Sequence, residues 1–115
     1  MTNLWEETTT TLMEHGKTFK DVKYIQCSDF GITKENFEKV AKKSKYSSGF
    51  GAAEVADDLV VVGDNWWLER HEYDGSEWWE YKEKPKRISE IKEVSHLAGG
   101  MWDKLAKLNK IEVKR

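Results

Sequence analysis

The sequence predicts an α+β fold: a small antiparallel β-meander of three to four strands, with three to four helices packed mainly on one of its faces. Two observations predict this architecture. Trp-Trp pairs lie on both sides of Asp74-Gly75, a dipeptide that favours the two-residue turn of a β-hairpin. Segments before and after this hairpin place apolar residues at helical spacing, which predicts the helices.

The first expected element is a helix that follows Asn3 and ends at Gly16. Asparagine is a preferred N-cap residue, and Glu6 stands three positions later, as in a capping box. Glycine suits the left-handed position just past a helix C-terminus. The predicted apolar stripe of this helix comprises Leu4, Trp5, Leu12 and Met13.

A short strand and a second helix follow. Residues 22–27 alternate well enough to form a strand. Thr33 is a suitable cap for a helix over residues 34–43, whose buried stripe would comprise Phe37, Val40 and Ala41. Its lysines are interrupted by glutamates, which favours a solvated helix face over a nucleic-acid patch. Residues 52–56 are expected to form a short helical turn.

The meander is predicted to have strands at residues 59–62, 66–72 and 77–83. Pro85 closes the last strand, because proline cannot donate a hydrogen bond to a β-ladder.

Helices are predicted less clearly after Pro85 than before the hairpin. Three apolar residues at three-residue steps favour a short helix before Gly99-Gly100, although residues 91–97 as a strand are not excluded. A last amphipathic helix is expected after the glycines. No linker or repeat divides the chain, so we expect one domain over residues 1–115. The residues in these two apolar patterns are Ile88, Ile91 and Val94, then Met101, Trp102, Leu105 and Leu108.

A two-residue turn at Asp74-Gly75 fixes which residues share a face of the hairpin. The better candidate for the core-facing side comprises Trp66, Leu68, Arg70, Trp79 and Tyr81. The opposite side comprises Trp67, Glu69, His71, Trp78, Glu80 and Lys82. Both sides therefore hold tryptophan, and a domain this small covers one of them well. The second side is either a protein-binding surface or a set of tryptophans that pair across the strands.

Charge is unevenly distributed along the chain. Residues 54–83 contain ten acidic side chains against two basic ones, a net charge of −8, whereas residues 84–115 have a net charge of +5. Either the two regions compensate each other within the fold, or the acidic region meets a basic partner.

Composition indicates a protein of a reducing compartment. Cys27 is the only cysteine, so no internal disulfide can form. No apolar run approaches the roughly 18 residues that a membrane span needs. The first residues show neither the basic start nor the apolar stretch of a signal peptide. We therefore expect a cytoplasmic protein without a membrane partner.

Glu69, His71 and Glu80 share one side of the hairpin, which would suit a metal ion or an acid–base pair. The histidines and Cys27 lack the spacings of known zinc sites, and the glycine pairs lack the setting of a nucleotide-binding loop. We therefore expect no cofactor, no metal site and no enzymatic activity.

The hairpin sequence resembles small uncharacterised proteins of phages and prophages of Gram-positive bacteria. The resemblance rests on the Trp-Trp/Asp-Gly/Trp-Trp pattern within residues 58–82, and residues 52–56 and 97–102 belong to the same pattern. It implies a bacterial cytoplasm and an accessory phage gene. Such accessory proteins often act by occupying a host protein, including CRISPR nucleases.

The leading functional hypothesis is therefore a non-enzymatic binding protein that inhibits a host protein, most concretely a nucleic-acid-handling defence nuclease. Its expected contact residues are Trp67, Glu69, Glu72, Asp74, Glu77, Trp78 and Glu80. The alternative is a phage protein that binds nucleic acid through its basic C-terminal segment. The phosphate-contacting residues would then be Lys104, Lys107, Lys110, Lys114 and Arg115. Neither hypothesis identifies the partner or the oligomeric state.

Overall fold

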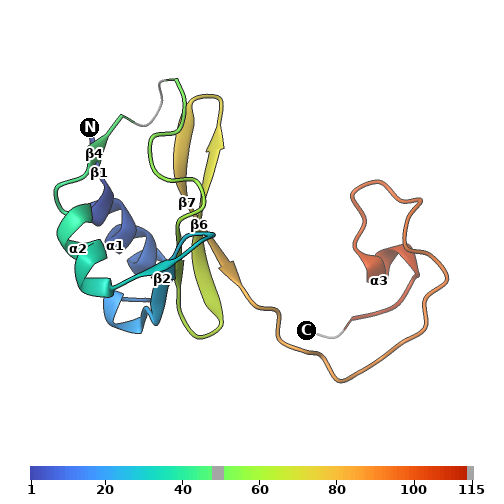
Figure 1. The fold of residues 1–115 in the computed structure, drawn as a ribbon. Coiled ribbons are helices and arrows are strands. Elements are labelled where there is room, and N and C mark those ends of the chain that lie inside the picture. Colours follow the sequence, from blue (N-terminus) through green and yellow to red (C-terminus); the bar gives the residue numbers. More distant parts are fainter. Residues whose placement is uncertain (48–50, 114–115) are drawn as a thin grey trace. The chain divides into compact units, whose positions relative to one another are not determined.

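A computed structural model describes residues 1–47 and 51–113 of the chain. The described residues form two compact units, Met1–Pro85 and Lys86–Arg115, and each is considered by itself. The first contains a five-stranded antiparallel sheet, a two-stranded sheet and two α-helices, and the second contains one short α-helix (Figure 1). The predicted α+β class is confirmed, with more strands than expected. The expectation of a single domain stays a prediction.

Two capped helices lie in the first unit, as predicted. Helix α1 (Leu4–Glu14) begins where Asn3 Oδ1 accepts a hydrogen bond from the Glu6 amide at 3.0 Å. Helix α2 (Lys34–Ala41) begins in the same way, with the Thr33 hydroxyl accepting from the Asn36 amide at 3.0 Å. A 3₁₀ turn, η1 (Phe19–Asp21), follows α1. Local capping chemistry thus sets both helix starts.

The predicted apolar stripes are correct at most positions and wrong at two. Leu4, Leu12, Phe37 and Ala41 are buried, but Met13 and Val40 are exposed. In α1 the position between the two buried leucines is held by Thr8, which is fully buried. Its hydroxyl donates to the Leu4 carbonyl at 2.7 Å and accepts from the Trp79 indole at 2.9 Å. A polar residue whose hydrogen bonds are satisfied can therefore occupy a core position where hydropathy would predict an apolar residue.

The main sheet has the strand order β3-β2-β5-β6-β7, and all neighbours are antiparallel. The predicted meander forms its last three strands, and the predicted strand at residues 22–27 forms the next. The strands are β2 (Tyr24–Gln26), β3 (Gly31–Ile32), β5 (Val60–Val62), β6 (Trp66–Tyr73) and β7 (Ser76–Glu83). The two-stranded sheet pairs β1 (Thr2–Asn3) with β4 (Lys45–Tyr46).

The hairpin β6–β7 has the register that the Asp-Gly turn predicts. Asp74 and Gly75 have φ values of 49° and 84°, the left-handed conformations of a type I′ turn. Because this turn fixes the pairing, it also decides which face of each strand is buried. In this register, Leu68 pairs with Tyr81, Glu69 with Glu80, Arg70 with Trp79, and Tyr73 with Ser76.

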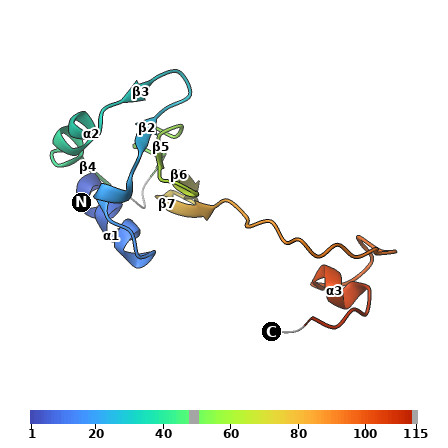
Figure 2. The same cartoon turned by 90° about the horizontal axis from the view of Figure 1, so that it is seen from below.

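Helices α1 and α2 lie on the same side of the hairpin (Figures 1 and 2). The core forms between these helices and the sheet. Its most completely buried apolar side chains are Leu12, Val22, Ile25, Val61 and Leu68. The hairpin face that was predicted to face the core does so, since Trp66, Leu68, Arg70 and Trp79 are buried and Tyr81 packs against the core.

Three expected elements differ in the structure. Residues 52–56 form no helical turn, and residues 88–97 form neither helix nor strand. The last helix, α3, spans only Leu105–Leu108, and Met101 and Trp102 lie before it, exposed. For the two C-terminal elements, the apolar spacing lacks a partner surface within the described part of their unit, and short helices depend on such packing. Val55 does pack against the core of the first unit, but without a helical turn.

Gly63, in the turn between β5 and β6, should not tolerate a side chain. A Cβ atom at this position would overlap the buried indole of Trp66. We expect Gly63→Ala to lower the free energy of unfolding by roughly 1–3 kcal/mol, the usual cost of overpacking a core. Urea unfolding monitored by circular dichroism measures it.

The matched control for this prediction is Gly31→Ala. A Cβ at Gly31 meets only the Ile25 carbonyl, at an ordinary 3.6 Å, so stability should change by less than about 1 kcal/mol. Equal losses in the two variants would contradict the close approach of Trp66 to Gly63.

Candidate functional site: the outer face of the hairpin

The outer face of the hairpin is defined here as Trp67, Glu69, His71, Trp78, Glu80 and Lys82. Strand alternation and the β6–β7 register direct these side chains away from the core-facing residues. Trp78 is exposed and the other five are half-buried. Among the residues described for Met1–Pro85, no helix covers this face (Figures 1 and 2). All six side chains are therefore at least partly accessible to a partner.

The pairing of the sheet extends this surface beyond the hairpin. Trp67 pairs with Lys82 on one side and with Val62 on the other, and Val62 pairs in turn with Tyr24. Tyr24 is about half exposed and Val62 is half-buried. Sequence reasoning did not assign Tyr24 to the site, because the pairing of β2 with β5 joins segments far apart in the sequence. The surface is thus a four-strand-wide face with aromatic, aliphatic and acidic side chains.

Each outer-face tryptophan donates its indole N–H to a glutamate two residues ahead on the same strand. Trp67 Nε1 donates to Glu69 Oε1 at 2.6 Å, and Trp78 Nε1 donates to Glu80 Oε2 at 2.9 Å. Residues at i and i+2 of a strand share a face, which brings each pair together. The carboxylates are thereby held by the protein's own indoles, and Lys82 adds a weaker electrostatic attraction to Glu69.

Glu69 has a further partner. Its Oε2 lies 2.8 Å from His71 Nε2, so one carboxylate joins a tryptophan and a histidine. The indole N–H of Trp67, followed by the hydrogen bond with His71, lowers the pKa of Glu69 below its ordinary value. Glu69 therefore remains a carboxylate at neutral pH and contributes negative charge to the outer face.

Glu72 and Asp74 are exposed near the hairpin tip, where they are accessible as predicted. Asp74 lies in the turn itself. Glu72 lies on the core-facing side of β6 by alternation, opposite Glu77, but beyond the part of the sheet that the helices cover. These two carboxylates extend the acidic character of the hairpin beyond the outer face.

Glu77 is not a surface residue, and its assignment as a contact residue is corrected. Its side chain is 3% exposed and pairs with Arg70 Nη2 at 2.8 Å. It also accepts hydrogen bonds from the backbone amides of Glu54, at 2.6 Å, and Val55, at 3.2 Å. Burial by itself raises the pKa of Glu77, but these two amides and Arg70 outweigh it, so the pKa lies below its ordinary value.

Arg70 is the centre of this buried cluster. Besides Glu77, Arg70 Nη1 pairs with Glu7 Oε1 at 2.9 Å, and its guanidinium lies 4.8 Å from the Trp79 ring centroid. Tyr46 donates its hydroxyl hydrogen to Glu7 at 2.6 Å and accepts from Arg70 at 3.3 Å. Burial, with the hydrogen bond to Glu7, raises the pKa of Tyr46 to about 12. Among the described residues, Arg70 Nε has no hydrogen-bond partner.

Of the three residues in the acid–base hypothesis, Glu69 and His71 are in contact. Glu80 is held by Trp78 and does not join Glu69 and His71 in one ligand cluster. Within the described ranges, three other residues bring potential metal-ligand atoms within 4.8 Å of one another. They are Cys27, Asp29 and Asp58. The Ser28 amide donates to Asp58 at 3.0 Å, and this bond lowers the pKa of Asp58.

The basic residues of the alternative hypothesis lie around α3. Lys104 occupies the N-cap position, Lys107 lies 3.4 Å from the Asp103 carboxylate, and Lys110 follows the C-cap residue. Lys114 and Arg115 lie outside the described residues. Lys104 lies two residues from the exposed Trp102, whereas the ion pair of Lys107 with Asp103 offsets part of the positive charge there.

Comparison of the chain with protein-family models, with curated proteins and with solved structures found no match. In residues 1–47 and 51–113, no helix has the length and hydropathy that a membrane crossing requires.

Truncation of the buried Glu77 should cost far more stability than truncation of the outer Glu80. We expect Glu77→Ala to cost about 3–5 kcal/mol of unfolding free energy, because it leaves a buried arginine with one partner fewer. Glu80→Ala, which removes an outer-face carboxylate, should cost less than about 1 kcal/mol. Urea unfolding compares the two variants, and equal costs would contradict the burial of Glu77.

The lowered pKa of Glu77 also predicts how stability depends on pH. A carboxyl group whose pKa is lower in the folded than in the unfolded chain stabilises the fold above the unfolded-chain pKa, ordinarily 4.5. This contribution disappears as the pH falls below that value and through the folded-state pKa. Unfolding free energies measured from neutral to acidic pH should therefore fall more steeply for wild type than for Glu77→Gln. Parallel curves would exclude Glu77 as a source of acid sensitivity.

Proposed function

We propose that this chain is a non-enzymatic binding protein that inhibits a basic protein partner through the outer face of the hairpin. The observation that carries the proposal is the pair of indole–carboxylate contacts, Trp67 with Glu69 and Trp78 with Glu80, on a sheet face that no described helix of its unit covers. Aromatic anchors and fixed charges on one accessible face are the usual components of a protein-binding hot spot.

The fixed geometry supports binding rather than exposure alone. A side chain that is already held in place loses little conformational freedom when a partner binds, so more of the contact energy appears as affinity. Glu69 and Glu80 stay where a basic side chain of the partner would meet them. The adjacent Trp78, Tyr24 and Val62 offer apolar contact area beside these charges.

The charge of the region favours a basic target. Glu69, Glu72, Asp74 and Glu80 are all accessible, against one basic side chain of the outer face, Lys82. Arg70 is buried and is neutralised inside the fold. A phosphate backbone would be repelled by this surface, while a protein that itself binds nucleic acid would present the complementary charge. The narrower proposal is therefore a nucleic-acid-handling defence nuclease of the bacterial cytoplasm, a CRISPR nuclease most concretely, whose basic channel the hairpin would occupy.

The proposal is tested by DNA cleavage with a Cas9-type nuclease from a Gram-positive host, in the presence of the full chain. Wild type should inhibit cleavage. The double variant Glu69→Lys/Glu80→Lys should raise the half-maximal inhibitory concentration at least about 100-fold, because two attractive contacts become repulsive. The matched control is Glu14→Lys/Glu35→Lys, which makes the same change in net charge on two exposed helix positions.

Two outcomes would contradict different parts of the proposal, the first the nuclease as the target and the second the outer face as the binding surface. If an excess of the wild-type chain leaves cleavage unchanged, the nuclease is not the target. The outer face is then tested by capture from a Gram-positive lysate on immobilised wild type, on the double variant and on the control. If every protein that wild type retains is retained equally by Glu69→Lys/Glu80→Lys, the outer face is not the binding surface.

A further inference from the structure

The unit Lys86–Arg115 buries very little of its apolar surface. None of its described residues, 86–113, is fully buried, although this stretch is rich in large apolar side chains. Folded units below about 40 residues usually need a disulfide, a metal or association with another chain to be stable. The exposed large side chains of this unit are Ile88, Ile91, Val94, Leu97, Met101, Trp102, Leu105 and Val113.

The loop at residues 97–102 exposes three of these side chains, Leu97, Met101 and Trp102, and hydrogen bonds close the base of the loop. Asn109 closes that base: its Oδ1 accepts from the amides of Ser95 and His96 at 3.0 and 2.9 Å. Its Nδ2 donates to the carbonyls of His96 and Leu105, both at 2.9 Å. The residues just before the loop are thereby tied to the C-terminal end of helix α3, and the other end of the loop leads into that helix.

Trp102 is the most exposed large side chain of this loop. It is 99% exposed, and its φ of 62° lies in the left-handed region that a bulky residue rarely adopts. On the other side of the loop, Gly100 lies so close to Asp103 and Leu108 that a Cβ would come within 2.6 Å of Asp103 Oδ2. The loop is therefore packed against α3 in a way that directs an indole away from its own unit, and strained backbone of this kind is typical of functional positions.

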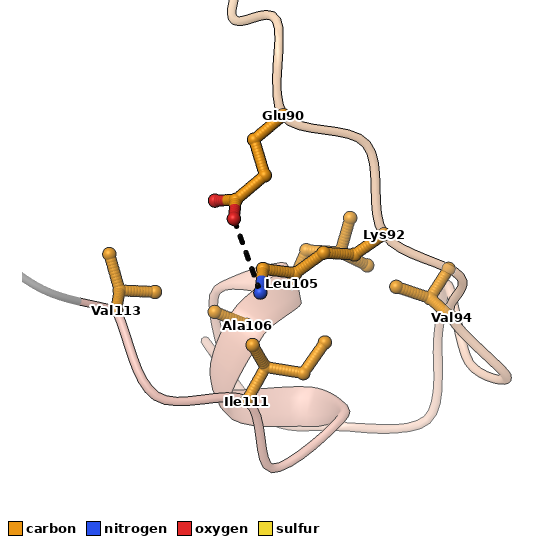
Figure 3. Close-up of a pocket in the computed structure, with 7 residues that line it drawn as sticks. All are labelled: Glu90, Lys92, Val94, Leu105, Ala106, Ile111 and Val113. Atoms are coloured by element: carbon orange, nitrogen blue, oxygen red, sulfur yellow. Dashed lines mark ion pairs between the residues drawn. The ribbon is translucent and has the colours of Figure 1, made fainter.

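The same unit contains an apolar pocket of about 240 Å³. Its volume is below the roughly 300–1,000 Å³ of pockets that hold drug-sized ligands, so it suits a single large side chain. Glu90 and Lys92 form an ion pair at 3.7 Å beside the aliphatic lining (Figure 3). The aliphatic residues that line it are Val94, Leu105, Ala106, Ile111 and Val113.

We infer that Trp102 of one copy occupies this pocket in a second copy, so that the chain forms a two-fold dimer through its C-terminal unit. Each copy supplies one indole and one pocket, which is the self-complementary arrangement that a two-fold axis requires. Burying two indoles and two aliphatic pockets also provides the apolar burial that a single copy of the unit lacks.

Charge supports a second copy as the occupant. Lys104 lies two residues after Trp102 in the sequence, and it forms no ion pair among the described residues. Glu112 lines the space next to the pocket, together with Glu90 and Lys92. Lys104, beside the indole, would therefore approach Glu112, beside the pocket of the second copy.

Sedimentation equilibrium of the full chain, from micromolar to millimolar concentration, tests the inference. Wild type should approach twice its mass of 13.5 kDa. Trp102→Ala removes the indole and Ala106→Leu fills the pocket, and each should weaken dimerisation at least about 30-fold, the factor that corresponds to 2 kcal/mol for a hot-spot residue. Phe30→Ala removes an exposed aromatic side chain from the other unit and should leave dimerisation unchanged.

Mixing the two variants separates a specific contact from loss of folding. Trp102→Ala retains an open pocket and Ala106→Leu retains the indole, so their mixture should associate more tightly than either variant alone. A monomeric wild type, a Trp102→Ala variant that dimerises like wild type, or a mixture no tighter than its components would each overturn the inference. The two units give independent tests, because the outer-face variants lie in Met1–Pro85 and do not alter this contact.

Discussion

The buried guanidinium of Arg70 holds together three segments of Met1–Pro85 that are distant in the sequence. Through Glu7 it reaches helix α1, through Tyr46 it reaches strand β4, and through Glu77 it reaches the amides of residues 54 and 55. A buried charge is costly unless its partners are complete, so these segments have to adopt their places together. The cluster therefore specifies the arrangement around the hairpin, and the apolar core supplies the driving force.

The hairpin itself could be predicted from sequence because its information is local. Asp74-Gly75 sets the turn, the turn sets the pairing, and the pairing decides which tryptophan of each Trp-Trp pair is buried. The helix starts at Asn3 and Thr33 were equally accessible, since a cap involves residues three apart. The strand count was underestimated because β1, β3 and β4 are two-residue strands without a pattern of their own.

The burial of Glu77 could not be predicted from composition. Glutamates at positions 77 and 80 look alike in a run of acids, and the difference lies in partners that come from other parts of the chain. Alternation does carry one signal: Glu77 falls on the same face as Trp79 and Arg70, and an acid among core-facing residues next to an arginine indicates a buried pair. The stripes around α3 failed for the opposite reason. Spacing predicts a face, but the described part of that unit offers no surface to bury it.

The contrast between the local hairpin and the long-range sheet has a consequence for folding order. Strands β6 and β7 are separated by two residues, and hairpins of this kind form within about 1–10 μs. Strand β2 meets β5 only after the chain closes a far longer loop, which slows the search for that pairing. In the hairpin, Trp67 pairs with Lys82 and Trp78 with His71, so the tryptophans do not pair with each other across the strands. We expect strands β6 and β7 to form early and to serve as the template on which β5, and then β2, assemble. The outer face of the hairpin would thus exist before the rest of the sheet is complete.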